Sequence, residues 1–202
     1  MKSWFTMALL TLSTPVVLAA ATLGQAAPPF TATDVAGKSV SLADFKGRHV
    51  VLEWVNPGCP FVVKHYGAGN MQATQKAAID KGVVWLAVNS TAPDAQDYRS
   101  PASMATWMTG QKAAASATLM DSDGRVGRAY GARTTPHMYL IDPAGTLVYA
   151  GAIDSKPTGN PADIAGATNY VRQALNESLA GKPISASSTR PYGCSVKYGS
   201  SA

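Results

Sequence analysis

The segment from Val50 to Tyr66 reads VVLEWVNPGCPFVVKHY and carries the features that decide the fold. Its first six residues, Val50 to Val55, are mostly apolar, which predicts a buried strand. A Pro-Gly corner follows, and Pro60 then stands where we expect the first turn of a helix, a position at which the missing N–H of proline costs nothing. Cys59 is therefore expected at the junction between a buried strand and a helix N-terminus.

This position favours a reactive cysteine. The unpaired N–H groups and the positive partial charge of a helix N-terminus stabilise a thiolate, so we expect the pKa of Cys59 to be lowered. Lys64 and His65 follow one to two turns later and add positive potential if they face the sulfur. The alternative is an inert buried thiol, but the flanking Pro-Gly turn and Pro60 favour the reactive interpretation.

Composition limits the class of protein. The chain has 202 residues, of which 46% are hydrophobic and 14% charged, as expected for one folded domain and not for a disordered chain. The formal net charge is +5, with Lys and Arg scattered along the chain, which argues against a nucleic-acid-binding surface.

The N-terminus has the pattern of a secretory signal peptide. Lys2 precedes a largely apolar run over residues 7–23, and small residues allow cleavage after Ala26. A retained membrane anchor is the alternative. We therefore predict a signal peptide over 1–26, a single domain over 27–183 and an irregular tail over 184–202 that carries Cys194. An exported protein, periplasmic or secreted, follows from the leader, and such compartments permit disulfides.

The remaining pattern predicts alternating strands and helices. After a hairpin within 28–48 and the strand at 50–55, the expected elements are a helix over 60–80 broken at 67–70, a strand at 82–90, a helix over 101–114, a strand at 117–121, a helix near 124–131, a hairpin over 137–142 and 146–151, and a helix over 162–180 closed by Gly181. This order indicates a three-layer α/β domain with a mixed sheet. The stretch DSDG at 121–124 is read as a plain turn, because a calcium loop would need a Glu where Ala132 stands.

A second candidate feature is the Thr135-Pro136 pair just before a predicted strand. A cis proline at this place would leave the backbone of Thr135 free to pair with a strand of a substrate beside Cys59. The alternative is an ordinary trans proline at the first residue of a strand.

These residues resemble the thioredoxin superfamily. Strand–PGCPFVVKHY–helix and TTPHMYLIDPAGTLVYAG carry the likeness, and PPFTATDVAGKSVSLADFKGRHVVL is similar to the N-terminal extension of redoxins. WLAVNS, VGRAYG and the ending LAGKPISASSTRPYGCSVKY are similar to a peroxiredoxin-like subgroup of the branch that contains alkyl hydroperoxide reductase and thiol-specific antioxidant proteins. The resemblance covers about residues 28–198. It implies a thioredoxin-like fold with thiol-based redox activity.

The chain departs from both catalytic patterns of these relatives. In the peroxiredoxin pattern Pro-x-x-x-Thr/Ser-x-x-Cys, the Pro position is Leu52 and the Thr position is Asn56, and the Arg expected beside the thiolate is represented only by the shifted Arg133. In the thioredoxin pattern Cys-x-x-Cys, the second cysteine is replaced by Val62. Efficient peroxidase chemistry is therefore not implied, and a resolving thiol is missing nearby in the sequence.

Cys194 is the only other cysteine in the chain and is the candidate resolving thiol. It lies in a small, polar tail that can fold back over the domain, so that it could attack a mixed disulfide or sulfenic acid at Cys59. The alternative is a static Cys59–Cys194 disulfide, which would stabilise the fold by about 4–5 kcal/mol in the chain-entropy model. Both interpretations stay open from the sequence.

The sequence also offers candidates for a metal site and for a proton acceptor. Cys59, Cys194, His65 and His137 could form a soft metal site, but they lack compact ligand spacing, so no metal ligand is assigned. Glu53 in the buried strand could accept a proton, although a satisfied core residue is the favoured interpretation.

The sequence thus predicts an exported thiol-disulfide oxidoreductase or peroxiredoxin-like antioxidant. Its expected catalytic residues are Cys59, Cys194 and Pro136, and its expected substrate-binding residues are Thr135, Pro60 and Phe61. No organic cofactor is expected, because electrons would come from a partner thiol protein. The expected partners are a thiol or disulfide protein or a small peroxide. The competing hypothesis is a non-catalytic redoxin-fold binding protein with a structural Cys59–Cys194 disulfide or a weak metal site.

Overall fold

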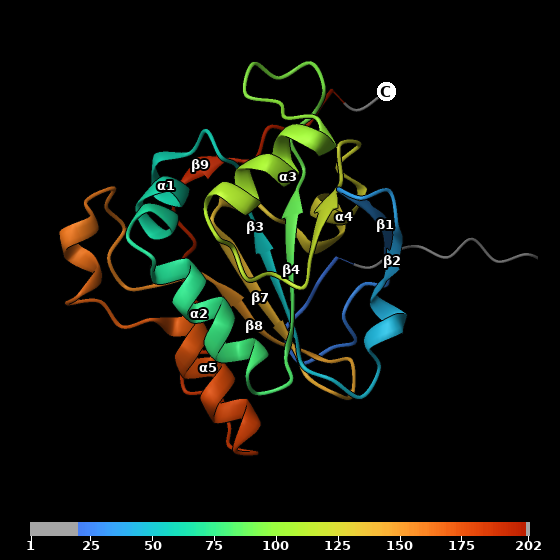
Figure 1. Cartoon of the computed structure of the whole chain (residues 1–202). Helices are drawn as coiled ribbons and strands as arrows, with labels where there is room; N and C mark the ends of the chain where they lie inside the picture. Colours follow the sequence, from blue (N-terminus) through green and yellow to red (C-terminus); the bar gives the residue numbers. More distant parts are fainter. Residues whose placement is uncertain (1–19, 201–202) are drawn as a thin grey trace, which may run out of the picture.

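The structure, a computed structural model, describes residues 20–200. Its main element is a seven-stranded sheet with the order β2-β1-β5-β4-β3-β7-β8 (Figure 1). The strands are β1 Thr31–Asp34, β2 Ser39–Ser41, β3 Val50–Trp54, β4 Val84–Asn89, β5 Ala117–Met120, β7 His137–Ile141 and β8 Leu147–Gly151. The predicted strands and both predicted hairpins are confirmed.

The sheet is mixed, as predicted. Strand β4 pairs in parallel with β3 and β5, whereas β7 runs antiparallel to β3 and β8 antiparallel to β7. Every residue of β3 and β4 is buried. Strands covered on both faces read as continuous apolar runs, which explains why the sequence shows no alternation there.

Helices cover both faces of the sheet. The helices α1 Pro60–Gly67, α2 Asn70–Ile79, α3 Pro101–Gly110 and α5 Tyr170–Leu179 pack on one face (Figure 1). The opposite face is covered by α4 Arg125–Tyr130, by residues around the short 3-10 helix η1 Leu42–Phe45 and by the N-terminal segment. The predicted break between α1 and α2 is confirmed, and Gly69 there has the positive φ of 71° that favours glycine.

Two predicted helices are shorter than expected. Helix α3 ends at Gly110 and not at residue 114. Helix α5 begins at Tyr170 and not at residue 162, because the Asn169 side chain accepts a hydrogen bond from the Arg172 N–H at 2.9 Å and so caps the helix. Residues Pro161–Ile164 form a separate 3-10 helix, η2. Apolar spacing alone did not reveal this cap.

The tail also contains regular structure. Strand β9, Cys194–Ser195, pairs antiparallel with β6, Thr134–Thr135, in a second small sheet (Figure 1). The tail is held further along by hydrogen bonds from the Val196 N–H to the Arg133 carbonyl at 3.0 Å and from the Tyr198 hydroxyl to the Ala132 carbonyl at 2.8 Å. The predicted return of the tail over the domain is confirmed.

The predicted leader lies mostly outside the described residues. Of its last part, the Ala21 N–H donates to the Ala129 carbonyl at 2.9 Å, and the Gly24 N–H donates to the Leu147 carbonyl at 2.8 Å. Within residues 20–200, none of the helices has the length and apolar character needed to cross a membrane.

Candidate active site

Cys59 lies where strand β3 gives way to helix α1. It is the N-cap residue of α1, and Pro60 occupies the first turn, as predicted. Its thiol donates to the backbone carbonyl of Thr135, with a distance of 2.9 Å between sulfur and oxygen. The residue is only 1% exposed, although Gly58 and Pro60 on either side are exposed. Cys59 is thus at the molecular surface but covered.

The cover comes from the tail. The Thr135-Pro136 peptide bond is cis, as the sequence suggested, and Thr135 pairs with Cys194 across β6 and β9. The structure therefore brings Cys59, Thr135, Pro136 and Cys194 together. The prediction that the Thr135 backbone is free for a substrate strand is wrong in this structure, because the chain's own tail occupies that edge.

The pKa values of the two thiols are shifted in opposite directions. Burial alone raises the pKa of Cys59, but hydrogen bonds from the side chains of Cys194 and Thr135 and from the backbone N–H groups of Cys194 and Val62 outweigh it, so the pKa of Cys59 is lowered. Burial, the hydrogen bond to Cys59 and the negative charge of Cys59 raise the pKa of Cys194 to about 12. Of the pair, Cys59 is therefore the thiol that ionises first, and Cys194 keeps its proton more strongly.

The hydroxyl of Thr135 is a site feature that the sequence analysis missed. Its Oγ1 is buried and makes no hydrogen bond to another group within residues 20–200 while Cys59 is a thiol. Once the sulfur is ionised, this hydroxyl can donate to it, which is one of the effects that lower the pKa of Cys59. Its sequence signal is a hydroxyl-bearing residue directly before Pro136.

Lys64 and His65 do not serve the thiolate. Both are buried and face Asp154, with Asp154 Oδ2 at 3.9 Å from Lys64 Nζ and 3.8 Å from His65 Nε2. Burial lowers the pKa of His65 to about 4, so this ring is neutral near pH 7. The positive potential expected at Cys59 is therefore absent, because Lys64 faces Asp154 and His65 is neutral in a separate cluster described below.

The predicted substrate-binding residues flank Cys59. Pro60 is exposed, whereas Phe61 is partly buried and packs edge-on against Tyr192, with 5.7 Å between the ring centroids. A shallow groove of about 560 Å³ lies along the outer side of α1 next to Gly58, Pro60 and the exposed Val63. A substrate role for Pro60, Phe61 and Thr135 stays a prediction.

Glu53 is a satisfied core residue. It accepts hydrogen bonds from the Tyr66 hydroxyl at 2.8 Å, the Gln75 amide at 3.0 Å and the Trp85 indole N–H at 2.7 Å. Burial raises the pKa of Glu53, and these three bonds oppose the rise. The carboxylate therefore joins α1, α2 and β4 beneath the helices, as the favoured interpretation held.

The peroxide-binding positions of the sequence pattern are occupied differently here. The Asn56 side-chain amide donates to Thr91 Oγ1 at 3.2 Å and to Asp97 Oδ2 at 2.7 Å, while its oxygen accepts from the Gly58 N–H at 2.8 Å. Arg133 is exposed, and its charge acts on His137. Asn56 is thus committed to shaping the turn before Cys59.

The two histidines of the suggested metal site have other partners. His137 Nδ1 lies 3.3 Å from the Arg133 N–H and 3.1 Å from the Tyr139 hydroxyl. His65 bonds Asn70 and Tyr192. Within residues 20–200, no three His, Cys, Asp or Glu side chains are grouped so that they could hold a metal ion.

Comparison with known proteins agrees with this geometry. The sequence pattern of the AhpC/TSA family matches residues 23–150. The chain is 25% identical over 133 residues to the thiol-disulfide oxidoreductase ResA of Bacillus thuringiensis subsp. konkukian, a match that covers 62% of this chain and 67% of that protein.

Solved structures extend the likeness to nearly the whole chain. An uncharacterised conserved protein from Geobacillus kaustophilus is 31% identical with a TM-score of 0.76, covering 90% of this chain and 94% of that one. A hypothetical protein from Sinorhizobium meliloti 1021 is 27% identical with a TM-score of 0.79, covering 89% and 96%. The thioredoxin domain of a thiol-disulfide oxidoreductase from Bacteroides vulgatus is 29% identical with a TM-score of 0.51, covering 64% and 87%. The thioredoxin-like fold predicted from the sequence is confirmed.

Proposed function

The chain belongs to the AhpC/TSA family, and on this basis we propose that it catalyses thiol-disulfide exchange, with Cys59 as nucleophile and Cys194 as resolving thiol. The observation that carries the proposal is the pairing of Thr135 with Cys194, which puts the two cysteines in contact. The pKa of Cys59 is lowered there, whereas the pKa of Cys194 is raised. The relative ResA is a thiol-disulfide oxidoreductase, which supports the same chemistry here.

The reaction begins at the thiolate of Cys59. It attacks one sulfur of a partner disulfide, forms a mixed disulfide with that sulfur and releases the other sulfur as a thiolate. The negative charge of Cys59 is then lost. Because that charge is one of the effects that raise the pKa of Cys194, the proton of Cys194 becomes easier to remove at this step.

The second step closes the internal disulfide. The Cys194 thiolate attacks Cys59 Sγ, forms the Cys59–Cys194 bond and releases the second partner sulfur as a thiolate. The partner disulfide has gained two electrons and the cysteine pair has lost two. The same steps in reverse oxidise a partner dithiol, and the reduction potential of the pair decides the direction.

Disulfide exchange is favoured over peroxide reduction by the surroundings of Cys59. The Asn56 side chain makes hydrogen bonds to Thr91, Asp97 and Gly58. Arg133 is exposed to solvent, whereas the sulfur of Cys59 is covered. A peroxide bound at Cys59 would therefore lack the hydrogen-bond donors that polarise its O–O bond in the resembling peroxiredoxins. The surroundings of Cys59 thus favour disulfide exchange over the antioxidant role that the resemblance suggests.

Export is part of the proposal and rests on the leader. Lys2, the apolar run and the small residues before Ala26 have the pattern of a signal peptide. In a periplasmic or secreted setting, the expected partners are thiol or disulfide proteins.

The test is a redox titration of the protein in glutathione buffers, with free thiols trapped by alkylation and counted by intact mass. A Cys59–Cys194 disulfide that titrates near about −200 mV is expected for an exchange-active pair. A pair that resists reduction below about −300 mV would mark a structural disulfide and contradict the proposal. Failure of the two cysteines to form any mutual disulfide would contradict the role of Cys194. The Cys59→Ser and Cys194→Ser variants show which mass changes belong to the pair.

A further inference from the structure

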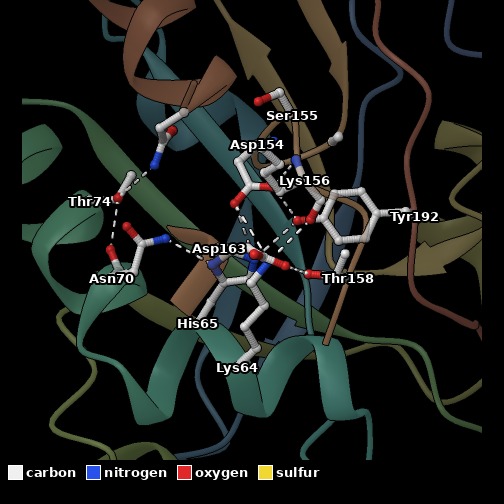
Figure 2. Close-up of polar contacts among 12 residues, drawn as sticks. Lys64, His65, Asn70, Thr74, Asp154, Ser155, Lys156, Thr158, Asp163 and Tyr192 are labelled. Atoms are coloured by element: carbon white, nitrogen blue, oxygen red, sulfur yellow. Dashed lines mark hydrogen bonds and ion pairs between the residues drawn. The ribbon is translucent and has the colours of Figure 1, made fainter. Parts of the chain in front are cut away.

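A buried cluster of ionisable side chains lies where helix α1 meets Asp154 (Figure 2). Lys64, His65 and Asp154 are each at most 3% exposed. Ionised groups are costly to bury unless partners satisfy them, so such a cluster indicates a specific role in positioning the chain.

The hydrogen bonds of the cluster lead to one residue of the tail. The Asn70 amide donates to His65 Nδ1 at 2.8 Å, so the ring proton of the neutral imidazole is on Nε2, which lies 3.2 Å from the Tyr192 hydroxyl. The Tyr192 hydroxyl in turn donates to Asp154 Oδ1 (Figure 2). The Tyr192 hydroxyl thus accepts a hydrogen bond from His65 and donates one to Asp154.

Tyr192 also closes the cluster from the outside. Its ring lies over Lys64, with 5.8 Å from Nζ to the ring centroid, and against Phe61. Lys64 Nζ donates to the Lys156 carbonyl at 3.1 Å. Burial and the neighbouring Asp154 carboxylate raise the pKa of Tyr192, so its hydroxyl stays protonated and able to donate.

The chain between Tyr192 and Cys194 leaves little freedom. Only Gly193 separates them, and it has a φ of 133°, which favours glycine. A Cβ at this position would collide with the carbonyl oxygen of Thr135. The placement of Tyr192 therefore constrains the position of Cys194 and its pairing with Thr135.

We propose that Tyr192, held by Asp154 and His65, is a latch that keeps the tail closed over Cys59 and holds Cys194 in reach of it. The closed tail occupies the β6 edge, which a partner strand would need. A macromolecular partner therefore reaches Cys59 only when the latch is open. The role of Cys194 in this inference rests on the proposed function, whereas the covering of Cys59 does not.

The latch makes two predictions of opposite sign. Opening it exposes Cys59, so the sulfur should react faster with outside reagents. Opening it also removes Cys194 from Cys59, so their disulfide should become easier to reduce. The alkylation rate of Cys59 therefore rises while the stability of the Cys59–Cys194 disulfide falls. A variant that only made the thiols less reactive would lower both.

The first measurement uses the Cys194→Ser background, in which Cys59 is the only thiol. Alkylation by iodoacetamide is followed over a pH range up to its plateau, so that access is separated from the pKa of Cys59. Adding Tyr192→Phe removes a hydrogen bond to a charged group and should raise the plateau rate of alkylation about tenfold. This factor corresponds to the lower end of the range for such bonds, because Asp154 Oδ1 still accepts a hydrogen bond from the Lys156 N–H.

A matched control is Tyr170→Phe, because Tyr170 lines a cavity of about 520 Å³ that Asp154 and Tyr192 also line. Its hydroxyl makes no hydrogen bond to this cluster within the described part of the chain, so the plateau rate should not change. Equal plateau rates for Tyr192→Phe and the Cys194→Ser parent would overturn the latch, and so would equal acceleration by both Phe variants.

A second variant guards against misfolding. Gly193→Ala lies in the tail, and its Cβ would collide with the Thr135 carbonyl oxygen. It should therefore displace β9 and reproduce the faster alkylation. In the two-cysteine protein, Tyr192→Phe should lower the equilibrium constant for the Cys59–Cys194 disulfide against glutathione about tenfold. Faster alkylation of Tyr192→Phe, together with no Cys59–Cys194 disulfide in the two-cysteine protein, would keep the covering latch and refute the proposed function instead.

Discussion

The proton of Cys194 is expected to control the acidity of Cys59. The Cys194 side chain is the largest of the effects that lower the pKa of Cys59, ahead of Thr135 and the backbone N–H groups. The Cys194→Ala variant removes this donor while keeping the backbone N–H and the pairing with Thr135. It should therefore raise the pKa of Cys59.

The magnitude follows from the kind of bond that is lost. A hydrogen bond to a charged group contributes about 1.5–3 kcal/mol, and a thiol is a weak donor, so the lower end applies. Since one pKa unit corresponds to about 1.4 kcal/mol, the expected rise is about one unit, or a tenfold smaller thiolate fraction well below the pKa. Exposure of Cys59 to water would act in the opposite sense, because burial is the largest effect that raises its pKa.

The assay is the pH dependence of Cys59 alkylation, or of thiolate absorbance, in three proteins. Cys194→Ser is the matched variant, because its hydroxyl keeps a donor at the same place. We expect the pKa of Cys59 to be higher by about one unit in Cys194→Ala than in Cys194→Ser. Equal pKa values in the two variants, or a lower value in Cys194→Ala, would refute the assignment of Cys194 as a donor to the thiolate.

Three further predictions concern stability. Glu53→Gln should lower the free energy of unfolding by about 1–3 kcal/mol in urea titrations, because an NH₂ group would replace one of two oxygens that only accept hydrogen bonds; an unchanged midpoint would contradict the carboxylate network. His65 stays neutral down to about pH 4 when folded but binds a proton near pH 6.5 when unfolded, so it should cost about 3 kcal/mol of stability as the pH falls from 6.5 to 4. Comparison of urea midpoints at pH 7 and 4.5 with His65→Gln checks this, since the variant should have the smaller loss. Gly127→Ala should destabilise the protein in thermal unfolding, although Ala normally favours a helix by about 1 kcal/mol, because its Cβ would collide with the ring and hydroxyl of Tyr198; a gain in stability would show that the tail is not docked there.

Local patterns predicted the framework of this site. The apolar run into Cys59, the Pro60 start of α1, the break at Gly69 and the hairpin after Pro136 all depend on residues adjacent in the chain. Backbone preferences of Pro and Gly and the burial of whole strands act over these short distances, so the sequence is sufficient to read them. The helix predicted over 162–180 is too long, because the apolar spacing runs on across Asn169, whereas the Asn169 cap makes α5 begin there.

The sequence by itself therefore determined the α/β framework, the place of Cys59 at a helix N-terminus and the presence of a second thiol in the tail. Only the tertiary structure decided that Cys194 pairs with Thr135, that Lys64 and His65 turn toward Asp154, and that Tyr192 holds the tail there. These contacts join residues about 40 to 90 positions apart, and no local preference specifies which distant side chains meet. They are selected by the packing of the tail against the finished sheet and by the need of the buried Asp154 carboxylate for partners.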